Sequence, residues 1–94
     1  MREKEVESAL VKAVKKRHGV ALKFVSPGMS GVPDRLVLMP KGKIAFVELK
    51  APGKKMRLLQ EKRKSQLEAL GFLVFCLDSK EEIGVMLDAI VQAA

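Results

Sequence analysis

The chain has 94 residues, of which 48% are hydrophobic and 31% are charged. This length allows one compact domain, and the composition is that of a folded protein rather than a disordered one. No apolar run approaches the roughly 20 residues that span a bilayer, and the N-terminus lacks the apolar segment of a signal peptide. We therefore expect a single domain over residues 1–94, located in the cytoplasm and without a membrane partner.

The formal net charge of +7 predicts a polyanionic partner. Between Lys50 and Lys64 there are seven basic residues against one acid, Glu61. Composition alone leaves DNA, RNA and a membrane surface open as the source of the negative charge.

Hydrophobic periodicity and turn residues predict seven elements in the order α-β-β-β-α-β-α. They are a helix over 3–17, strands over 21–25, 36–39 and 44–50, a helix over 55–70, a strand over 72–77 and a last helix that includes 83–91. This order indicates an α/β fold with a mixed sheet and helices on both of its faces.

The second predicted helix and the strand after it make specific predictions of burial. The helix is expected to point Met56, Leu59, Leu67 and Leu70 inward. The strand is almost wholly apolar, which is typical of a strand covered on both faces of a sheet. Its cysteine, Cys76, is the only one in the chain, so we expect a buried hydrophobe and neither a disulfide nor a zinc site.

Three polar side chains converge in the predicted hairpin. Glu48 and Lys50 are two residues apart on one strand and therefore share a face. Asp34 begins the preceding strand and lies opposite the end of the second strand once the hairpin closes. Taken alone, Glu48 and Lys50 could also form an ordinary ion pair between residues on one face.

The residues around this cluster resemble a known family. Asp34 followed by Glu48-x-Lys50 is similar to the PD-(D/E)XK nuclease signature. The longer strings 30–35 (SGVPDR) and 46–53 (FVELKAPG) resemble the VRR-NUC branch of that superfamily, and Gln60, Leu67 and Gly71 extend the match over nearly the whole chain. The resemblance implies a restriction-endonuclease-like core with the active site on an antiparallel hairpin.

The resemblance also implies further site residues and a substrate. Nucleases of this superfamily commonly supply another acid from the first helix, which here is either Glu3 or Glu7. The matching glutamine, Gln60, is expected to point into the carboxylate cluster, although a partly exposed helix glutamine is the alternative. Small stand-alone members are expected to form homodimers that cut branched DNA such as four-way (Holliday) junctions.

Phosphodiester cleavage requires an activated water and neutralisation of negative charge. Asp34, Glu48 and the main-chain carbonyl of Leu49 are hard oxygen ligands suited to Mg²⁺ or Mn²⁺. Lys50 can orient the attacking water or stabilise the transition-state charge. The residues expected to contact DNA are Lys23, Arg35, Lys54, Lys55 and Arg57.

The sequence therefore predicts a metal-dependent, structure-selective DNA endonuclease. Two alternatives remain open: a non-catalytic nucleic-acid-binding module with a nuclease fold, and a basic scaffold protein for RNA.

Overall fold

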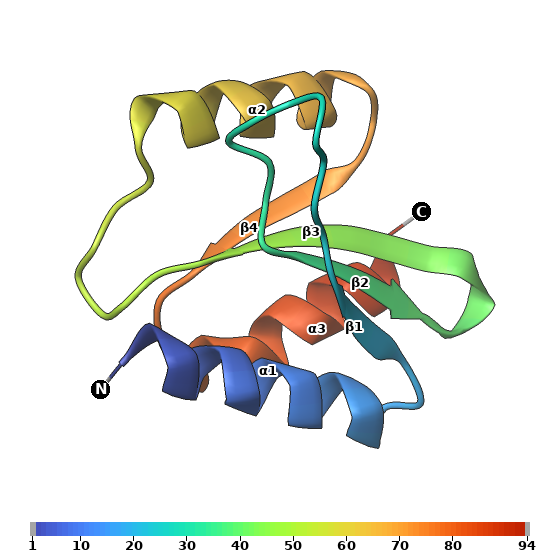
Figure 1. Cartoon of the computed structure of the whole chain (residues 1–94). Helices are drawn as coiled ribbons and strands as arrows, with labels where there is room; N and C mark the ends of the chain where they lie inside the picture. The colour runs from blue at the N-terminus through green and yellow to red at the C-terminus, as the bar shows by residue number, and fades with distance from the viewer. Residues whose placement is uncertain (1, 94) are drawn as a thin grey trace.

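The computed structural model of the chain describes residues 2–93, which form three helices and one four-stranded sheet (Figure 1). The elements are α1 (Glu3–Lys16), β1 (Val20–Lys23), β2 (Arg35–Met39), β3 (Lys43–Leu49), α2 (Leu58–Ala69), β4 (Leu73–Leu77) and α3 (Ile83–Gln92). Single 3₁₀ turns at Pro40–Gly42 and Lys80–Glu82 precede β3 and α3. The predicted order α-β-β-β-α-β-α and the mixed α/β class are confirmed.

The sheet has the strand order β1-β2-β3-β4. β1, β2 and β3 are antiparallel neighbours, whereas β4 runs parallel to β3. A parallel neighbour cannot follow through a tight turn, and the connection from β3 to β4 therefore crosses over through α2. This arrangement makes β3 a central strand with partners on both sides.

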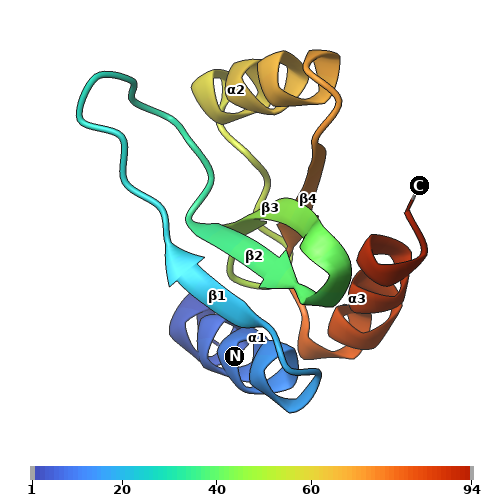
Figure 2. The same cartoon turned by 90° about the vertical axis from the view of Figure 1, so that its right-hand side faces the viewer.

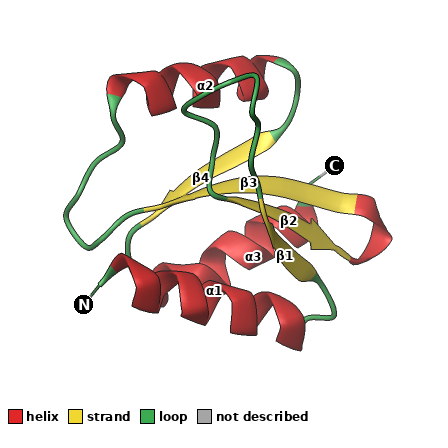
Figure 3. Ribbon diagram, viewed as in Figure 1, coloured by secondary structure: helices red, strands yellow, loops and turns green. Residues whose placement is uncertain are grey.

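One face of the sheet packs on α1 and α3 and forms the core (Figure 3). Val6, Leu10 and Val14 follow each other at four-residue spacing on α1, which places them on one side of the helix, and all three are fully buried. On β3 the alternate residues Val47 and Leu49 point to the same core. The buried side chains of α1 and of β3 thus meet in a single apolar layer.

The opposite face is covered by α2, which contributes no fully buried residue, and by the loop between β1 and β2, whose Phe24 ring lies 5.4 Å from that of Phe46 (Figure 2). The helix begins at Leu58, not at Lys55, and the predicted inward residues Leu59 and Leu70 are 41% and 73% exposed. An open pocket of about 460 Å³ lies between part of α2 and the loop that joins β1 to β2. The prediction of an inward-facing stripe was therefore wrong for Leu59 and Leu70, whereas Met56 and Leu67 are half-buried.

The prediction for β4 was also wrong in one respect. β4 is an edge strand, and Cys76 is exposed on the α2 side of it. The poor cover that α2 gives to this face leaves the thiol accessible. Within residues 2–93, the structure contains no helix long and apolar enough to cross a membrane.

Candidate active site

The carboxyl end of β3 brings the predicted acids together. Arg35 pairs with Val47 across β2 and β3, and continuing this register by one residue places Asp34 opposite Glu48. The Asp34 carboxylate accepts a hydrogen bond of 2.8 Å from the main-chain N–H of Leu49 through Oδ2. This bond fixes Asp34 at the end of β3 although it lies outside the strand itself.

Glu48 is the only buried charged residue in the part of the chain that the structure describes, with 2% exposure. Its Oε2 accepts a hydrogen bond of 2.6 Å from the Gln60 side-chain amide. The Lys50 ammonium lies 3.4 Å from the same oxygen, on the same face of the strand. The other oxygen, Oε1, is buried without a hydrogen-bond partner among residues 2–93. An unpartnered buried carboxylate oxygen is costly unless a cation or donor satisfies it.

The environment of Glu48 changes its acidity. The pKa of this carboxyl is raised from its ordinary 4.5 to about 7, first by burial and second by the neighbouring charge of Asp34. Lys50 acts in the opposite direction, and Glu3 makes a smaller contribution that raises the pKa. Two carboxylates therefore share one site where a single lysine does not balance them.

Gln60 reaches Glu48 from the first turn of α2. Its carbonyl oxygen accepts the main-chain N–H of Arg57 at 2.9 Å, while its amide donates to Glu48. The β1–β2 loop supports this helix: Arg63 donates to the main-chain oxygen of Ser30 at 2.7 Å. Gly31 lies so close to Leu59 that a Cβ would be 2.6 Å from the leucine Cγ. The loop that ends in Asp34 and the helix that carries Gln60 are thus held against each other.

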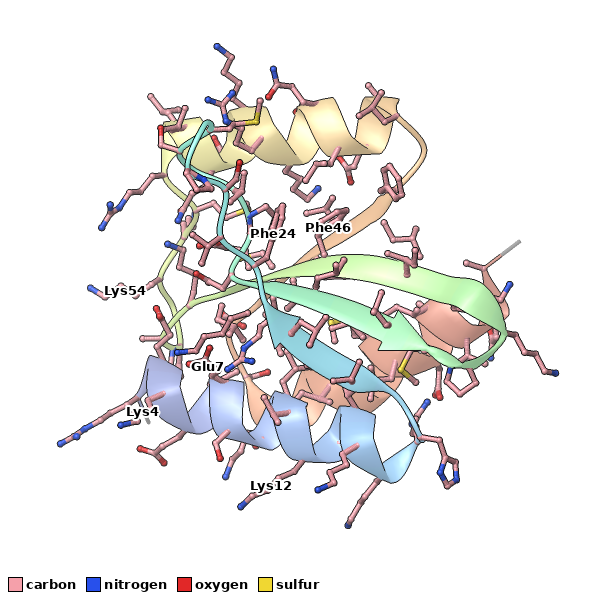
Figure 4. The ribbon with its side chains drawn as sticks, turned by 45° about the vertical axis from the view of Figure 1, so that its right-hand side comes forward. Lys4, Glu7, Lys12, Phe24, Phe46 and Lys54 are labelled. Atoms are coloured by element: carbon pink, nitrogen blue, oxygen red, sulfur yellow. The ribbon has the colours of Figure 1, made fainter. Side chains whose placement is uncertain are left out.

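The two candidate acids of α1 differ in their surroundings. Glu7 accepts a hydrogen bond from Arg35 at 3.0 Å and lies on the side of α1 that faces the sheet (Figure 4). Glu3 forms no ion pair among the described residues, and its charge makes a small contribution that raises the pKa of Glu48. The structure thus brings Glu3 into the electrostatic field of the cluster and commits Glu7 to an arginine.

The Glu7–Arg35 pair was missed at the sequence level. The Arg35 side chain is 13% exposed and also donates to the main-chain oxygen of Ala21 at 2.9 Å. The two residues are 28 positions apart, and no local pattern joins a helix residue to a strand residue at that separation. Arg35 is therefore held in an ion pair and is largely buried, although Lys23, another predicted DNA contact, lies directly opposite it across β1 and β2.

The other predicted DNA contacts are exposed. Lys54, Lys55 and Arg57 lie in the loop between β3 and α2, directly after the acidic cluster. Figure 4 shows Lys54 projecting outward from this loop. Lys23 is exposed at the end of β1.

The donor set at the end of β3 fits a divalent cation with oxygen ligands. Glu48 offers the unpartnered Oε1, and the Asp34 carboxylate and the Leu49 main-chain carbonyl are adjacent in the chain or in register. Within residues 2–93 no three Asp, Glu, His or Cys side chains are grouped closely enough to hold a metal by themselves. A cation here would need the main-chain carbonyl and water as additional ligands, as Mg²⁺ commonly does.

The chain is similar to two known proteins. It is 53% identical over 81 residues to a protein named "Putative nuclease p44" from Acyrthosiphon pisum secondary endosymbiont phage 1, an alignment that covers 86% of this chain and 87% of the relative. A solved structure described as a VRR_NUC domain superposes with a TM-score of 0.85 at 28% identity, over 92% of this chain and 94% of that one. No protein-family model matches the chain. The identity to the phage protein, the superposition and the cluster of Asp34, Glu48 and Lys50 together show that the chain belongs to the VRR-NUC family of nucleases.

Proposed function

We propose that this chain is a Mg²⁺- or Mn²⁺-dependent endodeoxyribonuclease that hydrolyses phosphodiester bonds at the carboxyl end of β3. The observation that carries the proposal is the buried Glu48 carboxylate, whose Oε1 has no partner among the described residues. Two neighbouring groups support it: Asp34 accepts the main-chain N–H of Leu49, and the Lys50 ammonium lies 3.4 Å from Glu48 Oε2.

Asp34, Glu48 and the Leu49 carbonyl would hold the cation. When bound, a divalent ion supplies positive charge to the scissile phosphate and lowers the pKa of a nearby water. It would also relieve the repulsion between the two carboxylates and satisfy Glu48 Oε1, which no residue of the chain between 2 and 93 does.

Lys50 positions the attacking water and stabilises negative charge on the phosphate. Its ammonium sits beside Glu48 with a side chain only 12% exposed, so it acts in a site from which most water is excluded. Gln60 keeps the Glu48 carboxylate in one orientation, because its amide donates to Oε2 and leaves Oε1 directed to the site. Glu3 is the acid of α1 that we assign to the cluster, since Glu7 is held by Arg35.

The exposed cations after β3 would bind the DNA backbone. Lys54, Lys55 and Arg57 begin within four residues of Lys50, and Lys23 lies at the end of β1. Arg35 would join them only by breaking its ion pair with Glu7, so its place in the DNA contact depends on substrate binding.

The direct test is a cleavage panel. Purified protein is mixed with labelled four-way junction, flap and linear duplex, in Mg²⁺, in Mn²⁺ or in EDTA. We expect cutting only with metal, a preference for a branched substrate, and loss of cutting in Asp34→Ala, Glu48→Ala and Lys50→Ala while binding is retained. Glu81→Ala removes an exposed carboxylate on the 3₁₀ turn before α3 and serves as the control. Binding without cutting under every metal would instead assign the chain to the non-catalytic module.

A homodimer through the open face of the sheet is the second part of the proposal. On the α2 side, Val20, Leu22 and Ile44 are 45%, 44% and 39% exposed, and they are neighbours through Leu36 and Leu38 in the strand register. This patch carries no charge, so two chains of +7 can meet there without opposing their lysines.

Sedimentation tests the dimer. Wild type is expected at twice the 10.4 kDa mass of one chain, and Leu22→Lys is expected to sediment as a monomer because it places an ammonium in the patch. Lys23→Ala changes the next residue, which points to the other face, and should leave the dimer intact. A wild type that remains monomeric at a protein concentration of about 100 µM would exclude this interface.

A further inference from the structure

Cys76 lies beside Glu48 on the floor of the candidate active site. The two residues are in register on the parallel strands β4 and β3, so their side chains point to the same face of the sheet. Glu48 is 2% exposed, whereas Cys76 is exposed. The site is thus closed directly over Glu48 and open one strand further along, over β4 at the edge of the sheet.

The helix α2 borders this open edge. β4 runs back beneath α2, so the start of the helix and the end of the strand lie on the same side of the molecule (Figure 1). At about 100° per residue, Lys64 lies about 40° from Gln60 around the helix, and Arg63 lies about 60° to the other side of Gln60. Gln60 donates to Glu48, and Arg63 holds the β1–β2 loop. Lys64 is therefore on the side of α2 that faces away from this loop, toward the β4 edge.

The charges around Cys76 agree with this position. The pKa of the thiol is raised, first by partial burial and second by the carboxylate of Glu48, and Asp78 also raises it. Lys50 and Lys64 lower it. The ammonium groups of Lys50, at the end of β3, and of Lys64, on α2, thus both act at the thiol.

Lys64 is available to an anion. Its side chain is 33% exposed, and its ammonium lies 3.0 Å from Glu68, four residues along the helix. Ion pairs at this spacing on a helix surface are weak, so a phosphate can replace the carboxylate. Asp78, the other acid near the thiol, accepts the main-chain N–H of Gly53 at 3.4 Å. Since residues 50–64 hold seven cations against one acid, the surface around Lys64 attracts a polyanion.

We propose that the cleaved DNA strand crosses β4 over Cys76 and that Lys64 binds the phosphate next to the cleaved one. The inference rests on the proposed function, which supplies the identity of the polyanion and the position of the cleaved phosphate at Glu48. Neighbouring strands of a sheet lie about 4.8 Å apart, which at about 3.4 Å of helix axis per nucleotide corresponds to one or two nucleotides. Lys64 then supplies the first positive charge that the strand meets beyond the buried, unpartnered Oε1 of Glu48.

The first test asks whether DNA covers Cys76. This residue is the only cysteine of the chain, so its reaction with an aromatic disulfide can be followed in wild type by the release of one aromatic thiolate. The rate is measured in EDTA, which prevents cutting, with and without the four-way junction of the cleavage panel. A junction concentration of about ten times the Kd should slow the reaction about tenfold, because the thiol then reacts only in the unbound protein.

A matched control moves the thiol to the outer side of α2. In Cys76→Ser/Ser65→Cys the single cysteine replaces an exposed serine that lies about 140° around the helix from Gln60. The junction should leave the reaction rate of this variant unchanged. Equal protection of both positions would mean that DNA slows the reagent generally, and would overturn the proposed strand path.

The second test is the salt dependence of binding. Anisotropy of the labelled junction is measured in EDTA between about 50 and 200 mM KCl. Loss of one phosphate contact in Lys64→Gln should lower the slope of log K against log [salt] by about 0.9 and weaken binding by up to roughly tenfold at 100 mM salt. The control Lys62→Gln has the same net charge, but Lys62 is exposed about 160° around the helix from Lys64, and its slope should stay close to that of wild type.

Glu68→Gln should have the opposite effect. It removes the carboxylate that competes with the phosphate for Lys64, so binding should tighten by about twofold. Glu81→Gln gives the same net charge through an exposed residue before α3 and should bind as wild type does.

Failure of this inference and failure of the proposed function give different results. If the protein cuts DNA but the junction does not protect Cys76, or Lys64→Gln has the slope of Lys62→Gln, the inference is wrong and the nuclease activity stands. If the protein cuts no substrate but shows the protection and the lower slope, the strand path is supported and the proposed cleavage fails.

Discussion

Replacement of the buried carboxylate should stabilise the metal-free protein, and by an amount that depends on pH. Burial raises the pKa of Glu48 from 4.5 to about 7 in the folded state. The folded protein therefore binds more protons than the unfolded chain between these values, and its stability falls as pH rises from 4.5 to about 7. At about 1.4 kcal/mol per tenfold change in acidity, the loss at pH 8 is about 3 kcal/mol, and at pH 5 it is below about 1 kcal/mol.

The variant Glu48→Gln removes this titration. In EDTA, its stability relative to wild type should increase by about 2 to 3 kcal/mol between pH 5 and pH 8, as measured by urea denaturation. Effects of the amide that do not depend on pH cancel in this difference. Glu81→Gln, an exposed carboxylate, is the matched control and should show no such increase. A change below about 0.5 kcal/mol in Glu48→Gln would refute the argument from burial, since ordinary surface substitutions vary by that amount.

Three further predictions concern Glu48 and the contact between α2 and the β1–β2 loop. Below pH 7, the affinity for Mn²⁺ measured by calorimetry should rise about tenfold per pH unit, because Glu48 must lose its proton to bind metal, and a flat profile would exclude it as a ligand. Gly31→Ala should destabilise the fold by about 1 to 3 kcal/mol in urea, because φ is +81° and the new Cβ meets Leu59. Arg63→Ala should free the β1–β2 loop from α2 and speed its limited proteolysis, whereas Lys62→Ala should not.

The fold was predictable where residues repeat at a fixed spacing. Val6, Leu10 and Val14 specify the buried side of α1, and the apolar alternation of β3 specifies its position in the sheet. The hairpin geometry then followed from turn residues, and with it the proximity of Asp34 to the end of β3, now visible in the bond to the Leu49 N–H. Local patterns are sufficient for these features because each depends on residues within one element or one turn.

The wrong predictions concern residues whose exposure or pairing depends on contacts between separate elements. Leu59 and Leu70 have the spacing of a buried stripe, but α2 rests on the β1–β2 loop and leaves them exposed. Cys76 lies in an apolar run, yet its strand is at the edge of the sheet and beneath this loosely packed helix. The pairing of Glu7 with Arg35 joins two elements and was beyond any local pattern.

The two faces of the sheet divide stability from chemistry. The cluster of buried apolar residues lies on the face that α1 and α3 cover, and Val47 and Leu49 of β3 point into it. Phe46 and Glu48 alternate with them along β3 and point to the opposite face. A strongly packed face can offset the cost of a buried, incompletely satisfied carboxylate on the opposite face of the same strand. The helix α2, which positions Gln60, has no fully buried residue and lies outside the cluster of core residues. Substitutions on the α1 and α3 side should therefore lower stability before activity, and substitutions on the α2 side should lower activity first.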